Sequence, residues 1–288
     1  MTQAESLLDP PTERVPPLTL TIGAVDYLNT VPLIAGLERL NSVRVLTDIP
    51  ANQVGLLETN QVDLALCSSI DLIRCPVPLE VVPVGMLGCE GPTLTVRLYS
   101  SVPVRHISRV ACDRDSHTSV ELLRILLREQ HGVEPELVDF DARGAHGEVQ
   151  PPDGVDALLL IGDKVVTSPV PESFKRLEID LGEAWFELTG LPFVFATWLC
   201  RAERTDEQFA RIKQAAVLLD RTRLRNAFRI DQVAALHAPA HGWSVKLARR
   251  YLVEHLRFDL NDRARLGLKR FLSLAGADAN ALPFHGEC

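Results

Sequence analysis

The sequence lacks the patterns that mark several large classes of protein. It has no apolar run approaching the roughly 18 residues that cross a bilayer. It has no Walker, G-x-G-x-x-G or G-x-S-x-G sequence, so the usual signatures of nucleotide binding and serine hydrolysis are absent. The histidines form no metal-triad spacing, so we expect no metal site. We also expect no membrane partner.

An excess of basic residues is also missing. The formal net charge is -8 and the pI is near 5.5. Nucleic-acid binding needs a basic face for the phosphates, so we expect no nucleic-acid partner. With 46% hydrophobic and 24% charged residues, the 288-residue chain has the composition of a soluble globular protein of about two domains.

Cysteine pairing motifs are absent too. None of the six cysteines forms a C-x-x-C pair, and Cys67, Cys112 and Cys200 each end an apolar run, which predicts buried, reduced thiols. Residues 1–17 contain acidic side chains and prolines instead of a basic start and an apolar core. They therefore do not resemble a signal peptide, and we expect a disordered leader on a cytoplasmic protein.

The first seventy residues alternate strand-like and helix-like segments. Strands are expected at 18–25, 43–49 and 62–67, and helices at 32–40 and 52–60. This alternation predicts a mainly parallel sheet in an α/β fold. Ligands of such folds bind at the carboxyl ends of the strands, beside helix N-termini.

The rest of the chain adds strands and then only helices. The apolar and amphipathic patterns predict strands at 79–87, 93–100, 107–112, 137–140, 156–161 and 193–200, and helices at 118–128, 181–188, 206–236, 244–255 and 260–275. No flexible linker is visible. We therefore expect the chain to cross between two lobes along extended segments near 100–108 and 192–200.

Two helix starts rich in hydroxyl groups follow apolar strands. Thr118 and Ser119 begin one helix after the loop 113–117, and Ser68 and Ser69 precede another. Free backbone N–H groups and the helix dipole favour a carboxylate or phosphate at such a position. Taken alone, each one is better explained by simple helix capping, by Ser116 or Thr118 in the first case. Together they suit a small ligand with two carboxylates.

Two other polar residues stand at strand ends. Asn29 follows the first strand and has both a donor and an acceptor for a substrate, although it could instead stabilise its own turn. Asp163 follows the apolar strand 157–161. Its carboxylate could serve as a general base if burial raises its pKa, or it could cap the helix at 164–166.

Four segments resemble the chorismate dehydratases of the futalosine route to menaquinone. They read IGAVDYLNTVPL (22–33), DSHTSVELL (115–123), ALLLIGD (157–163) and DLGEAWFELTGLPFVFATW (180–198). The last is the most specific, and the resemblance covers roughly residues 20–275 in order. It implies a fold like the type II periplasmic binding proteins, with two α/β lobes and a ligand cleft between them. One lobe would comprise 18–100 plus 200–288, and the other 101–199.

The resemblance also implies a hydro-lyase reaction. Chorismate would lose water to give 3-[(1-carboxyvinyl)oxy]benzoate, without a cofactor. Ser68, Ser69, Thr118 and Ser119 match the substrate-binding turns, and Thr95 keeps a hydroxyl where relatives often have Ser. Asn29 matches the catalytic or orienting Asn of the family.

The proton-abstracting group stays open at this stage. Asp163 is one candidate, and the enolpyruvyl carboxylate of the substrate is another. A related enzyme acting later in that pathway has a His base where this chain has Gly162, so its chemistry is not expected here. The competing hypothesis is a non-catalytic two-lobed protein that binds a small carboxylic acid. It would need export or a lipid anchor, and neither signal is visible.

Overall fold

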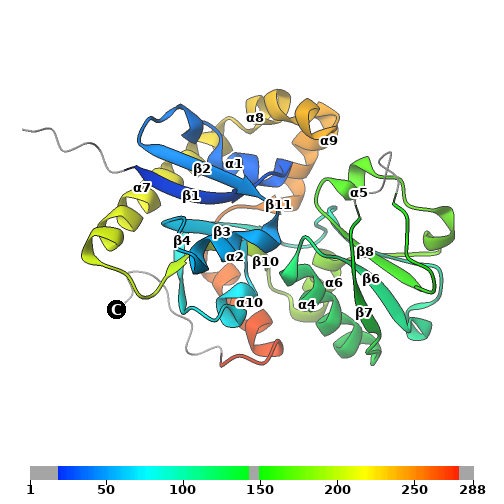
Figure 1. The fold of residues 1–288 in the computed structure, drawn as a ribbon. Helices are drawn as coiled ribbons and strands as arrows, with labels where there is room; N and C mark the ends of the chain where they lie inside the picture. Colours follow the sequence, from blue (N-terminus) through cyan, green and yellow to red (C-terminus); the bar gives the residue numbers. More distant parts are fainter. Residues whose placement is uncertain (1–18, 143–148, 279–288) are drawn as a thin grey trace, which may run out of the picture.

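The computed structural model describes residues 19–142 and 149–278 and contains two β-sheets, each covered by helices (Figure 1). We call the part built on the six-stranded sheet the first lobe and the part built on the five-stranded sheet the second lobe. The predicted disordered leader, residues 1–17, lies outside the described residues. The two-lobed α/β architecture expected from the alternating pattern is confirmed.

The sheet of the first lobe has the strand order β11-β4-β10-β3-β1-β2. Its strands are β1 (Leu20–Val25), β2 (Val43–Asp48), β3 (Leu64–Ser68), β4 (Leu79–Cys89), β10 (Phe193–Arg201) and β11 (Leu256–Arg257). The first three strands pair in parallel, as their alternation with helices predicts. β10 pairs antiparallel to both β3 and β4, because the chain returns to this lobe in the opposite direction.

The sheet of the second lobe has the order β7-β6-β8-β5-β9. Its strands are β5 (Val96–Ser100), β6 (Arg109–Asp113), β7 (Glu136–Phe140), β8 (Ala157–Ile161) and β9 (Leu177–Asp180). β6 pairs in parallel with β7 and β8, whereas β5 is antiparallel to β8 and β9. β9 was not expected from the sequence.

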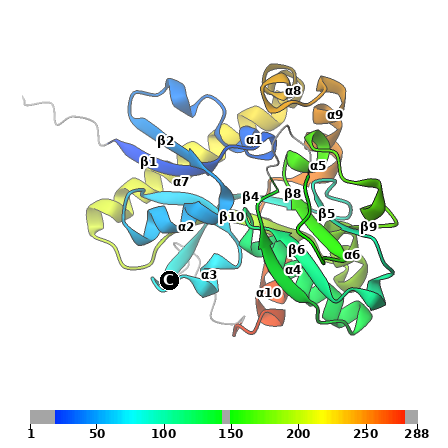
Figure 2. The same ribbon diagram turned by 45° about the vertical axis from the view of Figure 1, so that its right-hand side comes forward.

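Helices pack on both sheets (Figures 1 and 2). The second lobe carries α4 (His117–Leu126), α5 (Lys164–Thr167) and α6 (Leu181–Thr189). The first lobe carries α1 (Val31–Ile34), α2 (Pro50–Glu58), α3 (Asp71–Arg74), α7 (Asp206–Phe228), α8 (Ile230–His237), α9 (Val245–Arg250) and α10 (Asp262–Leu274). Short 3-10 turns occupy Leu28–Thr30, Leu37–Arg39, Val104–His106, Glu172–Phe174 and Ala238–His241, and single π turns follow α4 and α9 at Leu127–His131 and Tyr251–His255.

Three predicted helices were wrong in extent. The helix expected over 32–40 ends after Ile34, because Gly36 adopts a left-handed φ of 95° that a continuous helix does not allow. The helix expected over 206–236 is divided at Arg229, which leaves helical geometry between α7 and α8. The one expected over 244–255 ends as a π turn.

The sheets assign two strands differently from the expected lobe boundaries. The expected boundaries put β5, which ends at residue 100, in the first lobe, but β5 belongs to the second sheet. The same boundaries put most of β10 in the second lobe, but β10 belongs to the first sheet. The chain therefore changes sheets between β4 and β5 and again between α6 and β10. The second position coincides with the start of the crossing expected near 192–200.

An aromatic cluster joins the lobes where the chain returns. Trp185 of α6 packs edge-on against Phe193 of β10, with ring centroids 5.2 Å apart, and against Phe271 of α10 at 6.2 Å. All three rings are fully buried. Edge-to-face contacts add to the free energy gained from burying this much apolar area. The hydrophobic core therefore continues from one lobe into the other on this side.

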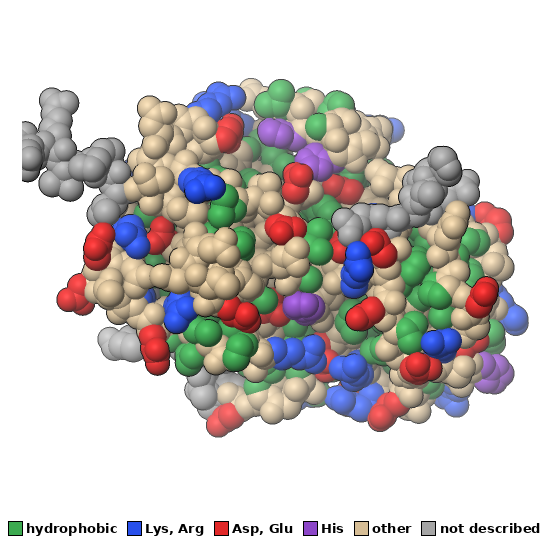
Figure 3. All heavy atoms as spheres, viewed as in Figure 1, with side chains coloured by type: hydrophobic (Ala, Val, Ile, Leu, Met, Phe, Trp, Pro, Cys, Tyr) green, Lys and Arg blue, Asp and Glu red, His purple; other side chains and the backbone are tan. Residues whose placement is uncertain are grey.

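The cysteines and the surface fit the sequence analysis. Cys67, Cys89, Cys112 and Cys200 are buried as free thiols, and burial raises the pKa of Cys112 and Cys200 to about 12. Acidic and basic side chains are interspersed on the face seen in Figure 3. In the described residues, no helix combines the length and apolar character needed to cross a bilayer.

Candidate functional site

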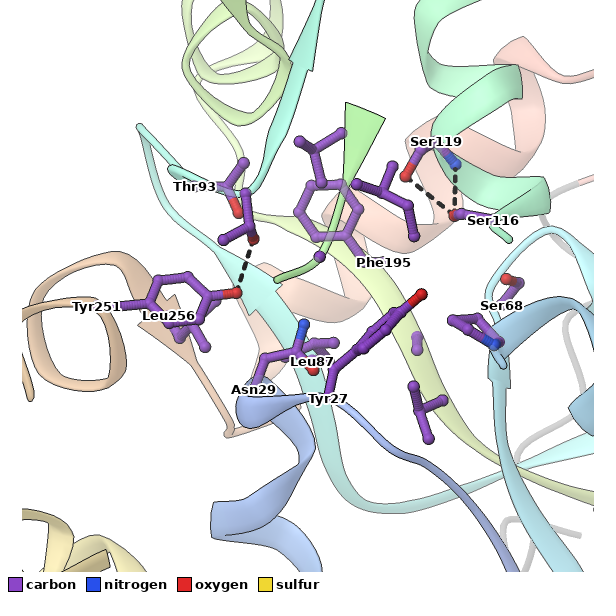
Figure 4. Close-up of a pocket in the computed structure, with 17 residues that line it drawn as sticks. Tyr27, Asn29, Ser68, Leu87, Thr93, Ser116, Ser119, Phe195, Tyr251 and Leu256 are labelled. Carbon is purple, nitrogen blue, oxygen red and sulfur yellow. Dashed lines mark hydrogen bonds between the residues drawn. The ribbon is translucent and has the colours of Figure 1, made fainter. Parts of the chain in front are cut away.

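A cavity lies between the lobes, at the ends of strands from both sheets. Its lining has residues from β1, β3, β4 and β10 on one side and from β5, β8 and α4 on the other (Figure 4). The polar side chains that line it are Tyr27, Asn29, Ser68, Thr93, Thr95, Ser116, Ser119 and Tyr251. The apolar ones are Val25, Pro50, Leu87, Val96, Ile161, Phe195, Ala196 and Leu256, and Gly162 completes the wall.

The first lobe contributes Asn29 and Ser68, both buried. Asn29 lies in the 3-10 turn after β1, and its Oδ1 accepts a 3.2 Å hydrogen bond from the Thr30 hydroxyl. Ser68 is the last residue of β3 and its side chain reaches the cavity. Ser69 does not: its hydroxyl donates to the backbone oxygen of Val194 at 2.8 Å. Neither serine caps α3, so the capping interpretation of this pair was wrong.

The second lobe contributes the N-terminus of α4. Ser116 is the N-cap, and its Oγ accepts a hydrogen bond from the Ser119 backbone N–H at 3.2 Å. The Ser116 hydroxyl donates to Ser119 Oγ at 3.0 Å, which leaves the Ser119 proton free for the cavity (Figure 4). Thr118 is buried but does not line the cavity. Its Oγ1 accepts from the Ile70 backbone N–H at 3.2 Å, across the two lobes.

The segment between the sheets places Thr93 and Thr95 at the cavity. Asp180, the N-cap of α6, accepts hydrogen bonds from the backbone N–H groups of Thr93 at 2.9 Å and Leu94 at 2.7 Å. Leu94 is held at a φ of 69°, which is uncommon for a residue with a side chain. Thr95 Oγ1 then lies 2.7 Å from the hydroxyl of Tyr251, which the π turn after α9 supplies.

Asp163 lies outside the cavity lining, and its carboxylate accepts three hydrogen bonds from the first lobe. Oδ1 receives the indole N–H of Trp243 at 2.9 Å. Oδ2 receives the Leu28 backbone N–H at 3.2 Å and lies 3.1 Å from Nδ1 of His241. The carboxylate makes no capping bond to α5, so the expected helix cap was wrong. Its partners make Asp163 a bridge between the lobes.

Glycine is the only residue type that position 162 accepts without a displacement of its neighbours. Its φ is +66°, and an added Cβ would lie 2.9 Å from the ring of Tyr27. A histidine base at this point would collide with Tyr27. Position 162 is therefore restricted to glycine while Tyr27 holds this orientation.

The cavity wall carries no formal charge. None of its lining residues, all in the described part of the chain, is Asp, Glu, His, Lys or Arg. Its two tyrosines stay protonated, because burial raises the pKa of both phenols. For Tyr27, the nearby carboxylates of Asp115 and Asp113 add to the increase in pKa. The cavity can thus bind an anion through neutral donors but offers it no ionisable base.

The sequence analysis named four of the eight polar lining residues as site residues: Asn29, Ser68, Thr95 and Ser119. Ser116 was named only as a cap. Tyr27 lay in a quoted motif without a role. Thr93 and Tyr251 were not identified, and Tyr251 is 156 residues from its partner Thr95, so no local pattern indicates their contact.

Comparison with known proteins shows which family the chain is related to. Residues 20–277 match the family model described as menaquinone biosynthesis, which is nearly the whole described chain. The chain belongs to this menaquinone biosynthesis family. It is therefore related to biosynthetic enzymes, and the family resemblance seen in the sequence motifs is confirmed.

Within the menaquinone biosynthesis family, the chain is similar to two curated proteins. It is 33% identical over 277 residues to the chorismate dehydratase of Thermus thermophilus, covering 91% of this chain and 96% of the relative. It is 30% identical over 122 residues to the chorismate dehydratase of Campylobacter jejuni, covering 42% of this chain and 50% of the relative.

Solved structures confirm the fold. The aliphatic sulphonate binding protein SsuA of Escherichia coli superimposes with a TM-score of 0.60 at 17% identity, covering 90% of this chain and 91% of that one. A protein from Archaeoglobus fulgidus gives a TM-score of 0.67 at 13% identity, covering 89% and 96%. At these identities the likeness concerns the two-lobed binding-protein architecture alone.

Proposed function

We propose that the protein is a chorismate dehydratase, a hydro-lyase that removes water from chorismate to give 3-[(1-carboxyvinyl)oxy]benzoate. The observation that carries this proposal is the cavity between the lobes, which offers neutral hydrogen-bond donors and no ionisable base. The full-length similarity to the Thermus thermophilus enzyme supports the same substrate. The cytoplasmic location remains a prediction.

In this cavity, the two carboxylates of chorismate would be bound by hydrogen-bond donors that carry no positive charge. Ser119 and the N-terminus of α4 provide one set, and Ser68, Thr95 and Asn29 provide another from the other walls. Ser69 and Thr118 support these sets through their bonds to Val194 and Ile70. Oriented hydroxyl and N–H groups stabilise anions well in a site with little water.

Proton removal would begin the reaction. The hydrogen on the ring carbon that bears the enolpyruvyl ether is acidified by the ring double bond conjugated to the carboxylate. Donors at that carboxylate would stabilise the dienolate-like transition state, which is the usual role of a preorganised oxyanion site. The electrons of the broken C–H bond enter the ring.

The base that fits this cavity is the substrate itself. Because the wall has no carboxylate or imidazole, we propose that the enolpyruvyl carboxylate of chorismate takes the proton, with Asn29 orienting it. The alternative base, Asp163, is engaged by Trp243, His241 and Leu28 outside the cavity. The adjacent hydroxyl then leaves with the C–O bond electrons and takes up the proton that the enolpyruvyl carboxylate had removed, so that water departs, the carboxylate is regenerated and the ring becomes aromatic.

The test is incubation of the purified protein with chorismate, followed by ultraviolet absorbance and mass spectrometry. A dehydratase gives an aromatic product that is lighter than chorismate by one water molecule. A non-catalytic binding protein, the competing function, would bind chorismate and leave its mass unchanged.

A further inference from the structure

Tyr27 connects the cavity to a buried ionic cluster in the second lobe. Its ring crosses the cavity beside Ser116 and Ser68 (Figure 4). Its hydroxyl lies 3.0 Å from Oδ2 of Asp115, the residue before the α4 N-cap. The phenol of the first lobe is therefore tied to the second lobe at the wall of the site.

Asp115 in turn is held by Lys164. The Lys164 ammonium lies 2.5 Å from Asp115 Oδ2 and 2.7 Å from Asp113 Oδ2. The side chains of Lys164, Asp113 and Asp115 are only 11%, 1% and 2% exposed. Burial raises the pKa of Asp113, and Lys164 opposes that increase. A buried cluster of this kind costs desolvation energy, and a hydrophobic replacement of similar volume is often as stable.

The cluster fixes the direction of the hydrogen bond from Tyr27. A carboxylate paired with an ammonium group only accepts, so the phenol proton of Tyr27 is committed to Asp115. Tyr27 lines the cavity, so the remaining acceptor capacity of its Oη is left for a ligand. The other polar groups of the wall, such as Ser119 and Asn29, have donors available to the ligand.

Because its own proton is engaged by Asp115, Tyr27 Oη can only accept from a ligand, and chorismate offers one group that can donate to it. With both carboxylates ionised and the ether oxygen lacking hydrogen, the ring hydroxyl is the only O–H donor of the molecule. We propose that Tyr27 Oη accepts a hydrogen bond from this departing hydroxyl, and that Asp115 and Lys164 are positioning residues that set its direction. The assignment rests on the proposed function and goes beyond it, because it names the group that recognises the leaving hydroxyl.

The hydrogen bond to Tyr27 would orient the departing ring hydroxyl for its protonation. With its own hydrogen directed to Tyr27, the leaving oxygen keeps its lone pairs free for the proton that converts it to water. It also gives specificity, because a site built to pair a substrate hydroxyl discriminates strongly against analogues without one. The dehydrated product, which lacks the ring hydroxyl, would then lose only this contact.

The test compares Tyr27→Phe with wild type on two ligands. We expect kcat/KM for chorismate to fall at least about 10-fold, as for a lost substrate hydrogen bond. The inhibition constant of 3-[(1-carboxyvinyl)oxy]benzoate should change less than about 2-fold. This product has no ring hydroxyl, so it has no hydrogen bond to Tyr27 to lose. Tyr99→Phe, which removes a phenol hydroxyl on β5 outside the cavity lining, is the matched control and should change neither value.

Other outcomes overturn the assignment in distinguishable ways. Equal weakening of chorismate and product by Tyr27→Phe would show a merely structural phenol. An unchanged kcat/KM would show that Tyr27 does not contact the hydroxyl. Asp115→Ala, which removes the acceptor of the Tyr27 phenol, should reproduce the selective loss without adding to it in the double variant, since both act through one bond. If wild type gives no product from chorismate, the proposed function itself fails, whatever the variants do.

Discussion

The indole N–H of Trp243 in the first lobe donates a 2.9 Å hydrogen bond to Oδ1 of Asp163 in the second. His241 and the Leu28 backbone N–H occupy the other oxygen of the same carboxylate. The side chains of Asp163 and His241 are each only 15% exposed. This set of contacts bridges the lobes beside the cavity, and it changes what substitution of Asp163 is expected to do.

Asp163→Asn should retain turnover. We expect kcat at saturating chorismate within about 10-fold of wild type, whereas loss of a general base costs roughly 100-fold or more. The free energy of unfolding should fall by about 1–3 kcal/mol, because an amide cannot accept from all three donors. Steady-state kinetics and denaturant unfolding measure the two effects. A kcat near background in a folded variant would restore Asp163 as the base.

Asn29→Ala should act on chemistry more than on stability. Asn29 lines the cavity, and its Oδ1 is oriented by the Thr30 hydroxyl. Removing one preorganised group from an anion-stabilising site typically lowers kcat by about 100- to 1,000-fold. Single-turnover measurements on Asn29→Ala check this value. A variant with unchanged kcat and a raised KM alone would show that Asn29 only binds the substrate.

Substitutions of the neighbouring residues Ser119 and Thr118 on α4 should have different effects, one on substrate binding and the other on stability. Ser119→Ala should raise KM for chorismate by about 10-fold, since a hydrogen bond to an anion is lost. Thr118→Val should instead lower the free energy of unfolding by about 1–3 kcal/mol, because the Ile70 N–H loses its buried acceptor. KM and denaturant midpoints for both variants decide the matter. Reversed effects would contradict the orientation of the two side chains.

Gly162→Ala should impair both folding and catalysis. A left-handed φ costs a non-glycine residue roughly 1–2 kcal/mol, and the new Cβ would push against the Tyr27 ring. We expect a lower melting temperature and a lower kcat/KM for chorismate. Gly132→Ala, also at a left-handed φ but with no atom near its Cβ, serves as the control for backbone strain. It should lower the melting temperature and leave kcat/KM unchanged.

The contact of His241 with Asp163 should make stability depend on pH. The hydrogen bond to Asp163 raises the pKa of His241 above its usual value near 6.5, although burial opposes this. A pKa that is higher in the folded state adds stability below the unfolded value, and this contribution is lost as pH rises through the folded value. His241→Gln should therefore destabilise the protein more at about pH 5.5 than at about pH 8, which lie on either side of the reference pKa. Thermal unfolding of wild type and variant across this range tests the sign, and a pH-independent difference would contradict it.

The sequence predicts the alternation of strands and helices well, because apolar periodicity reports burial directly. It also places Asn29, Ser68 and Ser119 at strand ends and helix starts, whereas Thr95 is indicated only by the family resemblance. It does not predict which of two adjacent hydroxyls faces the ligand, since Thr118 and Ser119 differ only by a rotation about the helix axis. Nor does it show Tyr251 beside Thr95, or Trp243 beside Asp163, because these pairs meet only when distant segments pack.

The most direct test of the account is the conversion of chorismate by the wild-type protein with no added metal or cofactor. The account predicts an aromatic product lighter than chorismate by one water molecule, formed at a rate that Asp163→Asn keeps within about 10-fold and Asn29→Ala lowers by about 100- to 1,000-fold. Tight binding of chorismate with its mass unchanged would contradict it.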